Sequence, residues 1–213
     1  MILTTRMKVA KVEPSRRVKG RILIYFEEGN LLKATEKEVL EFSLYPGRVL
    51  SGEEEMRLMR AAGLSRSRAR AAEMIGARAL SRKELCRRLV EKGESEENAA
   101  AAADWLEEIG ALDDLGYAKS VARHYSALGY GPAKLRDEFY RRGVPRELWE
   151  EAMTAETGDS AEAIDRYIAA KLRGKVLDEK LRRRICDGLR RRGFAWEDIK
   201  SALRRMDAEY REE

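Results

Sequence analysis

The chain has 213 residues, of which 38% are charged and 7% aromatic, and its formal net charge is +5. This composition is typical of solvated helices and argues against one large globular core. No apolar run is long enough to span a membrane, and Met1–Arg6 lacks the apolar stretch of a secretory signal, so a cytoplasmic protein without a membrane partner is expected. Cys86 and Cys186 are too few for a disulfide framework or a four-ligand zinc site, and we expect small, partly buried thiols.

The charge is distributed unevenly along the chain. Residues 1–52 carry 10 bases and 6 acids, and residues 159–213 carry 15 bases and 12 acids. Residues 81–112 carry 5 bases and 8 acids, and residues 113–158 carry 7 bases and 8 acids. Both ends are basic and the middle is not, which favours a partner of mixed potential over a uniform polyanion.

Residues 1–52 are predicted to form a small β-rich module. Thr35–Glu38 is a capping box that opens a short helix over Glu36–Phe42, and Val49-Leu50 is predicted to add a final strand. The module is too short for a core of its own, so it is expected either to lean on the first helices or to be loosely attached. Its other signals are a weak alternation over Met7–Val12, a β-prone run over Arg21–Phe26, a turn at Glu28–Asn30 and a return strand over Leu31–Ala34.

The linker helix after this module is predicted over Glu53–Ala62, and a second capping box, Ser51–Glu54, is predicted to open it. Gly63 is expected to end it, and helix is expected to resume after Ser65 or Ser67. Further along, Gly188 stands inside a predicted helix, where glycine costs about 1 kcal/mol relative to alanine, and it is expected to allow a close helix crossing. Pro132 and Pro145 are each predicted at the first position of a helix.

A stretch with a period of 50 residues occurs three times, and its copies end at Gly93, Gly143 and Gly193. Apolar residues four apart share one face of a helix, and a trailing glycine can adopt the left-handed conformation that ends a helix. Each copy therefore predicts a helix that ends at its glycine. The apolar residues eight and four positions before the glycines are Leu85 and Leu89, Leu135 and Phe139, and Ile185 and Leu189, and the bases directly before the glycines are Lys92, Arg142 and Arg192.

A second helix is predicted after each glycine, and a third before each copy, over residues 66–79, 115–128 and 161–172. The apolar positions six and ten after the glycines are Ala99 and Ala103, Trp149 and Met153, and Ile199 and Leu203. The fold is therefore predicted to be mainly α, with three tandem three-helix repeats forming an elongated, curved array behind the β-containing module. The predicted boundaries are 53–112 for the linker helix and repeat 1, 113–157 for repeat 2, and 158–213 for repeat 3 with a charged, frayed tail over Asp207–Glu213.

Residues with catalytic potential are few and scattered. A lone histidine, His124, is a poor basis for a triad or a metal site, and a surface or half-buried position is expected. Asp113 and Asp114 are explained more simply as a helix cap and its neighbour than as an acid pair or a magnesium site. Gly129–Gly131 lacks the lysine and the preceding strand of a phosphate loop. We predict no enzymatic activity, no cofactor and no metal. Three tryptophans share no position in the repeat, and we interpret them as core anchors: Trp105, Trp149 and Trp196.

The repeated Leu-x-x-x-Leu-x-x-x-Gly pattern, the segment Ile109–Ala118 and the phrase Gly129–Pro132 resemble the RecX family of RecA regulators. In that family an acidic turn precedes an aromatic-Ala pair, as Leu112–Asp114 precedes Tyr117-Ala118 here. The N-terminal module, including the run into Gly47–Leu50, is also similar to that of longer members, so the resemblance covers nearly the whole chain. Members are often richer in bases in the first two copies, which are net acidic here, and this weakens an inference of strong DNA binding.

The resemblance implies a non-enzymatic modulator, mainly an inhibitor, that acts in DNA repair and the SOS response. It implies binding along the RecA filament on single-stranded DNA, as a monomer, with restraint of filament extension, ATPase and strand exchange. The alternatives are a direct DNA-binding module built from helical repeats, and a scaffold for some other partner. For any single base a solvated helix face is the simpler interpretation, but their recurrence at matched positions predicts a discontinuous basic strip for partner binding: Arg87, Arg88, Lys134, Arg136, Arg141, Arg142, Arg182, Arg183, Arg184, Arg190, Arg191 and Arg192.

Overall fold

A computed structural model describes residues 7–173 and 177–212 of the chain, and the predictions for Met1–Arg6 and Glu213 concern residues outside these ranges. The described residues form two compact units. The first joins the sequence up to Arg78 with Leu85–Leu112, and the second joins Ala79–Glu84 with the sequence from Asp113 onward. Among the described residues, no helix combines the length and the apolar character needed to cross a membrane.

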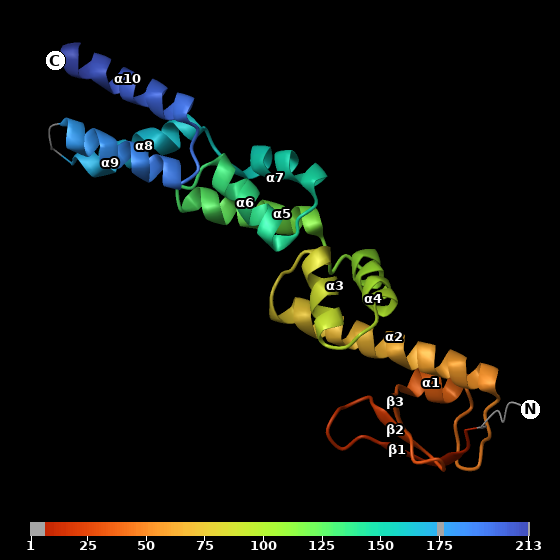
Figure 1. Cartoon of the computed structure of the whole chain (residues 1–213). Coiled ribbons are helices and arrows are strands. Elements are labelled where there is room, and N and C mark those ends of the chain that lie inside the picture. Colours follow the sequence, from red (N-terminus) through yellow and green to blue (C-terminus); the bar gives the residue numbers. More distant parts are fainter. Residues whose placement is uncertain (1–6, 174–176, 213) are drawn as a thin grey trace, which may run out of the picture. The chain divides into compact units, whose positions relative to one another are not determined.

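A three-stranded sheet comes first in the chain and helices follow it, as the mainly α prediction requires (Figure 1). The strands are β1 (Val9–Pro14), β2 (Ile22–Phe26) and β3 (Leu31–Ala34). The helices are α1 (Glu36–Glu41), α2 (Gly52–Ala77), α3 (Arg82–Glu91), α4 (Glu96–Glu108), α5 (Asp114–Ala127), α6 (Pro132–Arg142), α7 (Trp149–Glu156), α8 (Ser160–Leu172), α9 (Glu179–Arg191) and α10 (Trp196–Glu212), with a 3-10 turn over Arg146–Leu148.

The sheet is antiparallel in the order β1-β2-β3, and one of its faces is buried. Ile24 in the central strand pairs with Val12 on one side and Leu32 on the other. The buried face packs against Leu58 of α2, so the module shares its core with that helix (Figure 1). The sequence left open whether the module leans on the first helices or is loosely attached, and the structure shows that it packs against α2. This burial of apolar surface is the main force that holds so small a sheet in place.

The predicted end of the linker helix at Gly63 is wrong, because α2 continues through this residue to Ala77. Gly63 is buried, and a Cβ added to it would lie 2.9 Å from Nδ2 of Asn98 in α4. The absence of a side chain at Gly63 therefore allows α2 and α4 to cross closely. The N-terminus of α2 is fixed as expected by a capping box, in which Ser51 accepts a hydrogen bond from the backbone N–H of Glu54.

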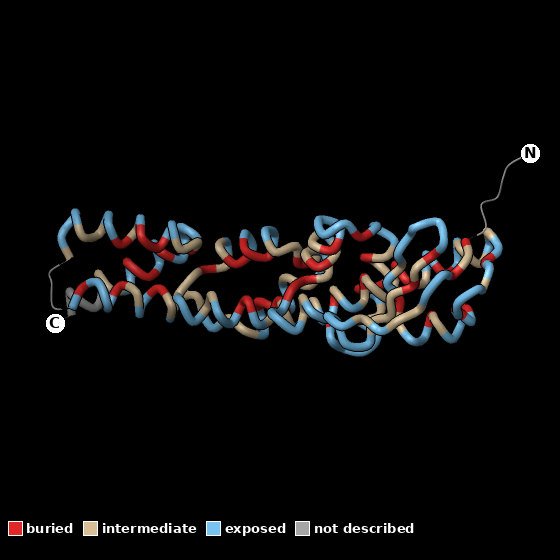
Figure 2. The backbone as a smooth tube through the Cα atoms, turned by 90° about the horizontal axis from the view of Figure 1, so that it is seen from below, coloured by how far each residue is buried: buried red, intermediate tan, exposed pale blue. Residues whose placement is uncertain are grey.

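The three repeat glycines end their helices as predicted. Gly93, Gly143 and Gly193 have φ values of 87°, 70° and 88°, which lie in the left-handed region. Figure 2 shows the buried residues gathered between paired helices, with the exposed residues on the outer sides. The apolar positions that define the repeat are all at most 1% exposed: Leu85, Leu89, Leu135, Phe139, Ile185 and Leu189. The period of 50 residues thus reports a repeated core.

Gly188 is buried in α9 at a close helix crossing, as predicted. A Cβ on Gly188 would overlap the hydroxyl oxygen of Tyr167 in α8 and lie 3.0 Å from its Cζ. Cys186 follows the buried Ile185 and is itself partly buried. Burial raises the pKa of its thiol, which makes the thiol less reactive. Cys86 is also partly buried.

Three local predictions need correction. Trp196 is 50% exposed and is no core anchor, whereas Trp105 and Trp149 are partly buried. Pro145 precedes the 3-10 turn Arg146–Leu148 and does not open an α-helix directly. The segment after Asp207, expected as a frayed tail, is helical, since α10 continues to Glu212. The error at Trp196 arose because burial of an aromatic residue depends on the register of the whole helix, and Trp196 stands at the first position of α10.

Candidate partner-binding surface

Helices α6 and α9 of the second unit meet end to end. The backbone N–H of Gly131, just before α6, donates a 2.8 Å hydrogen bond to the carbonyl oxygen of Arg192, and Ala133 donates one of 3.1 Å to Gly193. The first N–H groups and the last carbonyls of a helix have no partner inside that helix, so each end supplies what the other lacks. The repeat glycine is therefore a joint between repeats as well as a helix end.

The same joint occurs one repeat earlier. Ser81 stands 50 residues before Gly131, and its hydroxyl donates to the carbonyl oxygen of Arg142, which stands 50 residues before Arg192. Gly143 lies against Lys83, since a Cβ on this glycine would come within 3.0 Å of the lysine Cβ. Matched positions thus make matched contacts in two successive repeats.

Arg192 belongs to the joint and is not a free surface cation. Its Nη1 donates hydrogen bonds of 2.8 Å and 3.0 Å to the carbonyl oxygens of Leu128 and Gly129. The guanidinium lies 5.3 Å from the ring centroid of Tyr130 and 5.0 Å from that of Tyr167. Two carbonyls and two aromatic faces hold the charge in place. The segment Gly129–Gly131, which lacks the features of a phosphate loop, is part of this packing.

Arg142, at the matched position in α6, is held in a similar way. Its Nη1 donates a 3.1 Å hydrogen bond to the hydroxyl of Tyr117, and its guanidinium lies 5.9 Å from the ring centroid of Tyr125. Burial works against the charge of Arg142, but the hydrogen bonds to the two tyrosines outweigh burial and leave its pKa raised. Arg142 is therefore a permanent structural cation.

A buried carboxylate on α6, that of Glu138, forms ion pairs with three bases of the same helix. Glu138 is 2% exposed, and Lys134 lies 3.6 Å and Arg142 3.4 Å from its oxygens. Arg141 also pairs with Glu138. A buried acid requires such partners because an unpaired charge inside a protein is costly. The matched position in α9 is Gly188, so α9 carries no such acid.

The bases of α9 divide into paired and unpaired side chains. Arg182 lies 2.6 Å from Asp207, and this hydrogen bond raises its pKa. Arg183 lies 3.1 Å from Glu179, although both side chains are largely exposed. Within the described part of the chain, no ion pair is formed by three exposed side chains, Arg184, Arg190 and Arg191. We call these three with Arg183 the α9 basic face.

The remaining bases of the predicted strip make exposed contacts. Arg87 pairs with Glu91 in α3, and Arg136 lies 3.0 Å from Glu150. Exposed pairs of this kind are worth about 0–1 kcal/mol, so a partner can displace them at little cost. Arg87 and the partly buried Arg88 belong to the first compact unit, whereas the α6 and α9 bases belong to the second. The structure thus brings two of the three predicted groups of bases into one unit.

Helical register could have separated the structural bases from the exposed ones. Arg142 and Arg192 stand seven residues after Leu135 and Ile185, which are buried, and residues seven apart share a face. Arg182 stands seven residues before Leu189 and follows the same rule. The basic strip was predicted only from the recurrence of bases at matched positions of the three copies, and the position of each base relative to the buried residues was not used.

Asp113 and Asp114 serve two different helices. Asp113 caps α5, because its Oδ1 accepts hydrogen bonds of 3.0 Å from the backbone N–H groups of Leu115 and Gly116. Asp114 Oδ1 accepts a 2.7 Å hydrogen bond from the backbone N–H of Arg82 at the start of α3. Burial raises the pKa of Asp114. Asp113 is thus the predicted cap of α5 and Asp114 its predicted neighbour in the first turn, and the bond to Arg82 is a further role that local sequence did not indicate.

Within the ranges that the structure describes, no cluster of three or more histidine, cysteine, aspartate and glutamate side chains could hold a metal ion. His124 is exposed, in agreement with its predicted position at the surface. The absence of catalytic activity stays a prediction, and so do the domain boundaries and the partner-binding role of the bases.

Known proteins resemble this chain in sequence and in fold. Residues 113–153 match the family model described as RecX, second three-helix domain. A regulatory protein RecX from Xanthomonas citri is 35% identical over 136 residues, which cover 63% of this chain and 84% of the relative. One from Stenotrophomonas maltophilia is 36% identical over 137 residues, which cover 63% of this chain and 83% of the relative.

Two solved structures share the fold at low sequence identity. A crystal structure of a regulatory protein RecX matches with a TM-score of 0.70 and 21% identity, over 92% of this chain and 99% of that chain. The crystal structure of RecX from Lactobacillus salivarius matches with a TM-score of 0.63 and 18% identity, over 70% of this chain and 99% of that chain. With relatives above 30% identity that are covered over most of their length, this chain belongs to the RecX family of regulatory proteins.

Proposed function

We propose that this protein is a non-enzymatic modulator of RecA, mainly an inhibitor, that acts as a monomer in the cytoplasm. It binds along the RecA filament on single-stranded DNA and restrains filament extension, ATP hydrolysis and strand exchange. Membership of the RecX family supports the regulatory role. The observation that carries the binding role is the α9 basic face, in which three exposed arginines lack an ion pair within the described residues.

The chemistry of this face suits a filament. A RecA filament presents DNA phosphates beside acidic protein side chains, and exposed guanidinium groups bind both carboxylate and phosphate. Arg192 and Arg142 fix the orientation of α9 and α6 within the second unit, so the exposed arginines are presented from a rigid support. Several modest contacts on linked repeats raise the total affinity without a tight single site.

The test follows ATP hydrolysis by RecA on single-stranded DNA while purified protein is added. We expect hydrolysis to fall as the added protein approaches the amount of RecA. A parallel sample measures binding to the same DNA without RecA. Unchanged hydrolysis at stoichiometric amounts would sink the proposal.

Direct DNA binding by the helical repeats is the second candidate, and the unpaired arginines of α9 favour it. Binding of this kind weakens with salt by roughly 0.7 log units per log unit of salt for each phosphate contact on single strands. The net charge of 113–158 is negative, which counts against DNA as the sole partner of both repeats. The candidate fails if RecA inhibition persists at a salt concentration that abolishes binding to free DNA.

A further inference from the structure

The face of the sheet turned away from the core carries a cross-strand pattern of its own. In the strand register, Leu23 pairs with Glu13 and Lys33, and Tyr25 pairs with Lys11 and Leu31. The neighbours of these residues in the strands, Ile24 among them, point into the core, so the six side chains share the open face. Two leucines and a tyrosine thus form an apolar floor on the outside of the module. We call this the open sheet face.

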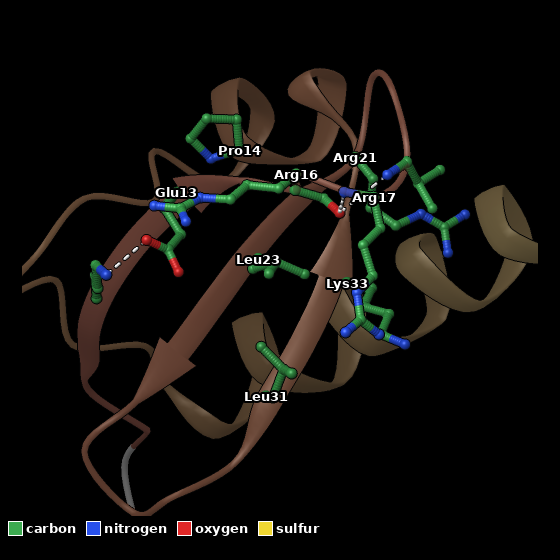
Figure 3. Close-up of a pocket in the computed structure, with 11 residues that line it drawn as sticks. Glu13, Pro14, Arg16, Arg17, Arg21, Leu23, Leu31 and Lys33 are labelled. Atoms are coloured by element: carbon green, nitrogen blue, oxygen red, sulfur yellow. Dashed lines mark hydrogen bonds and ion pairs between the residues drawn. The ribbon is translucent and has the colours of Figure 1, made fainter.

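Basic side chains surround one end of the open sheet face. Lys33 stands on β3, and the connection between β1 and β2 supplies three arginines, Arg16, Arg17 and Arg21. Together they line a hollow of about 560 Å³ whose apolar wall includes Leu23 and Leu31. Figure 3 shows these side chains around the two leucines. Hollows of roughly 300–1,000 Å³ are typical of sites for small organic groups.

These cations form no direct ion pair with an acid of the described residues, although the charge of Arg16 acts on nearby Glu13. Among the described residues, no ion pair is formed by Arg16, Arg17, Lys19, Arg21 or Lys33. Many arginines of the helical repeats, by contrast, lie against a carboxylate, as Arg182 and Arg123 do. Like charges this close repel one another, so a concentration of unpaired bases is a feature that an anionic ligand would stabilise.

The acid on the open sheet face is already neutralised. Glu13 lies 2.6 Å from Lys11, and the hydrogen bond from this lysine holds the pKa of Glu13 below its ordinary value. Lys11 also lies 5.9 Å from the ring centroid of Tyr25. Glu13 also interacts with Arg16, but it is the one acid among the described residues that line the hollow, so the hollow keeps a net positive charge.

We propose that the open sheet face binds single-stranded nucleic acid, with phosphates on the arginines and Lys33 and a base on the apolar floor. Unpaired bases stack or pack on side chains displayed by a sheet, while basic residues at the edge track the backbone. An acidic peptide would satisfy the charge but would leave Leu23, Leu31 and Tyr25 unused. The inference does not depend on RecA, and it assigns the binding of free single-stranded nucleic acid to the N-terminal module.

The test measures binding of the full chain to a fluorescent oligothymidylate by anisotropy over a range of salt. One variant combines Arg16→Gln, Arg17→Gln and Arg21→Gln. Its matched control combines Arg60→Gln, Lys200→Gln and Arg204→Gln, three exposed bases that belong neither to the open sheet face nor to the α9 basic face. We expect the first variant to lose about tenfold or more in affinity and to reduce the salt slope by about 2, since three phosphate contacts contribute roughly 0.7 each.

The control variant is expected to bind within about twofold of the unaltered chain, because exposed charges outside a site affect binding little. Equal losses in the two variants, or a loss in the control variant alone, overturn the inference. Thermal unfolding of each variant shows whether the fold is kept.

Two further measurements distinguish nucleic acid from other anions. Tyr25→Leu should weaken oligothymidylate binding about fivefold with an unchanged salt slope, because it removes an aromatic contact to a base and no charge. Lys33→Gln, on the edge strand, should reduce the slope by about 0.7 without disturbing the β1–β2 connection. Competition by polyglutamate or by anionic phospholipid vesicles as strong as that by oligothymidylate overturns the proposal.

Discussion

The backbone N–H of Gly131 donates a 2.8 Å hydrogen bond to the carbonyl oxygen of Arg192, and this bond joins α6 to α9 of the next repeat. The approach is so close that a Cβ on Gly131 would lie 2.6 Å from the carbonyl oxygen of Gly193 and 2.8 Å from the nitrogen of Phe194. Backbone atoms cannot move aside as a flexible side chain can. We therefore expect Gly131→Ala to destabilise the protein by about 1–3 kcal/mol, measured by chemical denaturation.

Gly158→Ala is the matched control, because a Cβ at this position would meet nothing within 4 Å. It should leave stability unchanged or raise it by about 0.4–1 kcal/mol, because alanine lowers the conformational entropy of the unfolded chain. If the two alanine variants unfold at the same denaturant concentration, the joint is not the close contact described.

Gly188 and Tyr167 form a pair whose coupling can be measured. Gly188→Ala should destabilise the protein, because the new methyl group would overlap the tyrosine hydroxyl. Tyr167→Phe removes that oxygen, so the double variant should recover part of the loss. A coupling energy of about 0.5–3 kcal/mol is expected from a double-mutant cycle in thermal unfolding. Strictly additive effects would show that the two residues do not touch.

Arg192 and Arg191 are neighbours with opposite roles. Arg192→Ala removes hydrogen bonds to the carbonyls of Leu128 and Gly129 and two contacts with aromatic rings, and it should cost about 1–3 kcal/mol of stability. Arg191→Ala removes an exposed side chain and should leave the melting temperature unchanged. Differential scanning calorimetry compares them, and equal melting temperatures would refute the structural role of Arg192.

Asp114 should make stability depend on pH in the acid range. Burial raises the pKa of this carboxyl above its ordinary value of 3.8, so the folded protein holds the proton more tightly than the unfolded chain. The contribution of Asp114 to stability is therefore largest below pH 3.8 and falls as pH rises through the raised pKa. Asp114→Asn should abolish this component while it keeps an acceptor for the N–H of Arg82.

Asp114→Ala separates the hydrogen bond from the charge. It removes the acceptor as well, and it should cost about 1–3 kcal/mol relative to Asp114→Asn at every pH, because the N–H of Arg82 loses its partner. Urea denaturation between pH 3 and pH 7 measures both effects. Identical pH profiles for the asparagine variant and the unaltered chain would contradict the assignment to Asp114.

Local signals were sufficient to predict most of the helices. Apolar residues four apart followed by Gly93, Gly143 or Gly193 identify helices that end at a glycine, since both the pattern and the stop are encoded within one helix. The capping box at Ser51 likewise fixed the start of α2. Gly63 was misread because only the presence of Asn98, 35 residues away, shows that it serves a helix crossing and not a helix end.

The candidate sites depend on contacts between distant residues, and the sequence predicted them less completely. The bond between Gly131 and Arg192 links residues 61 positions apart, and no local rule connects them. Recurrence identified the bases of α9 as a group, but the structure separates Arg192 from Arg191 by register. The bases between β1 and β2 contributed only to a count of charge, because the register of the sheet is needed to place them beside Leu23.

The α9 basic face gives the sharpest test of RecA regulation. Arg184→Glu, Arg190→Glu and Arg191→Glu together reverse charges that have no ion pair within the described residues, so the melting temperature should stay within a few degrees of the unaltered protein. We expect the concentration needed for half-inhibition of RecA ATP hydrolysis to rise about tenfold or more, because the reversed face repels phosphate and carboxylate. Lysine at the same three positions keeps the charge, and this control should retain most of the inhibition. If the glutamate variant inhibits as well as the unaltered chain, the face is only solvated surface, and the contact with the filament lies elsewhere on the molecule.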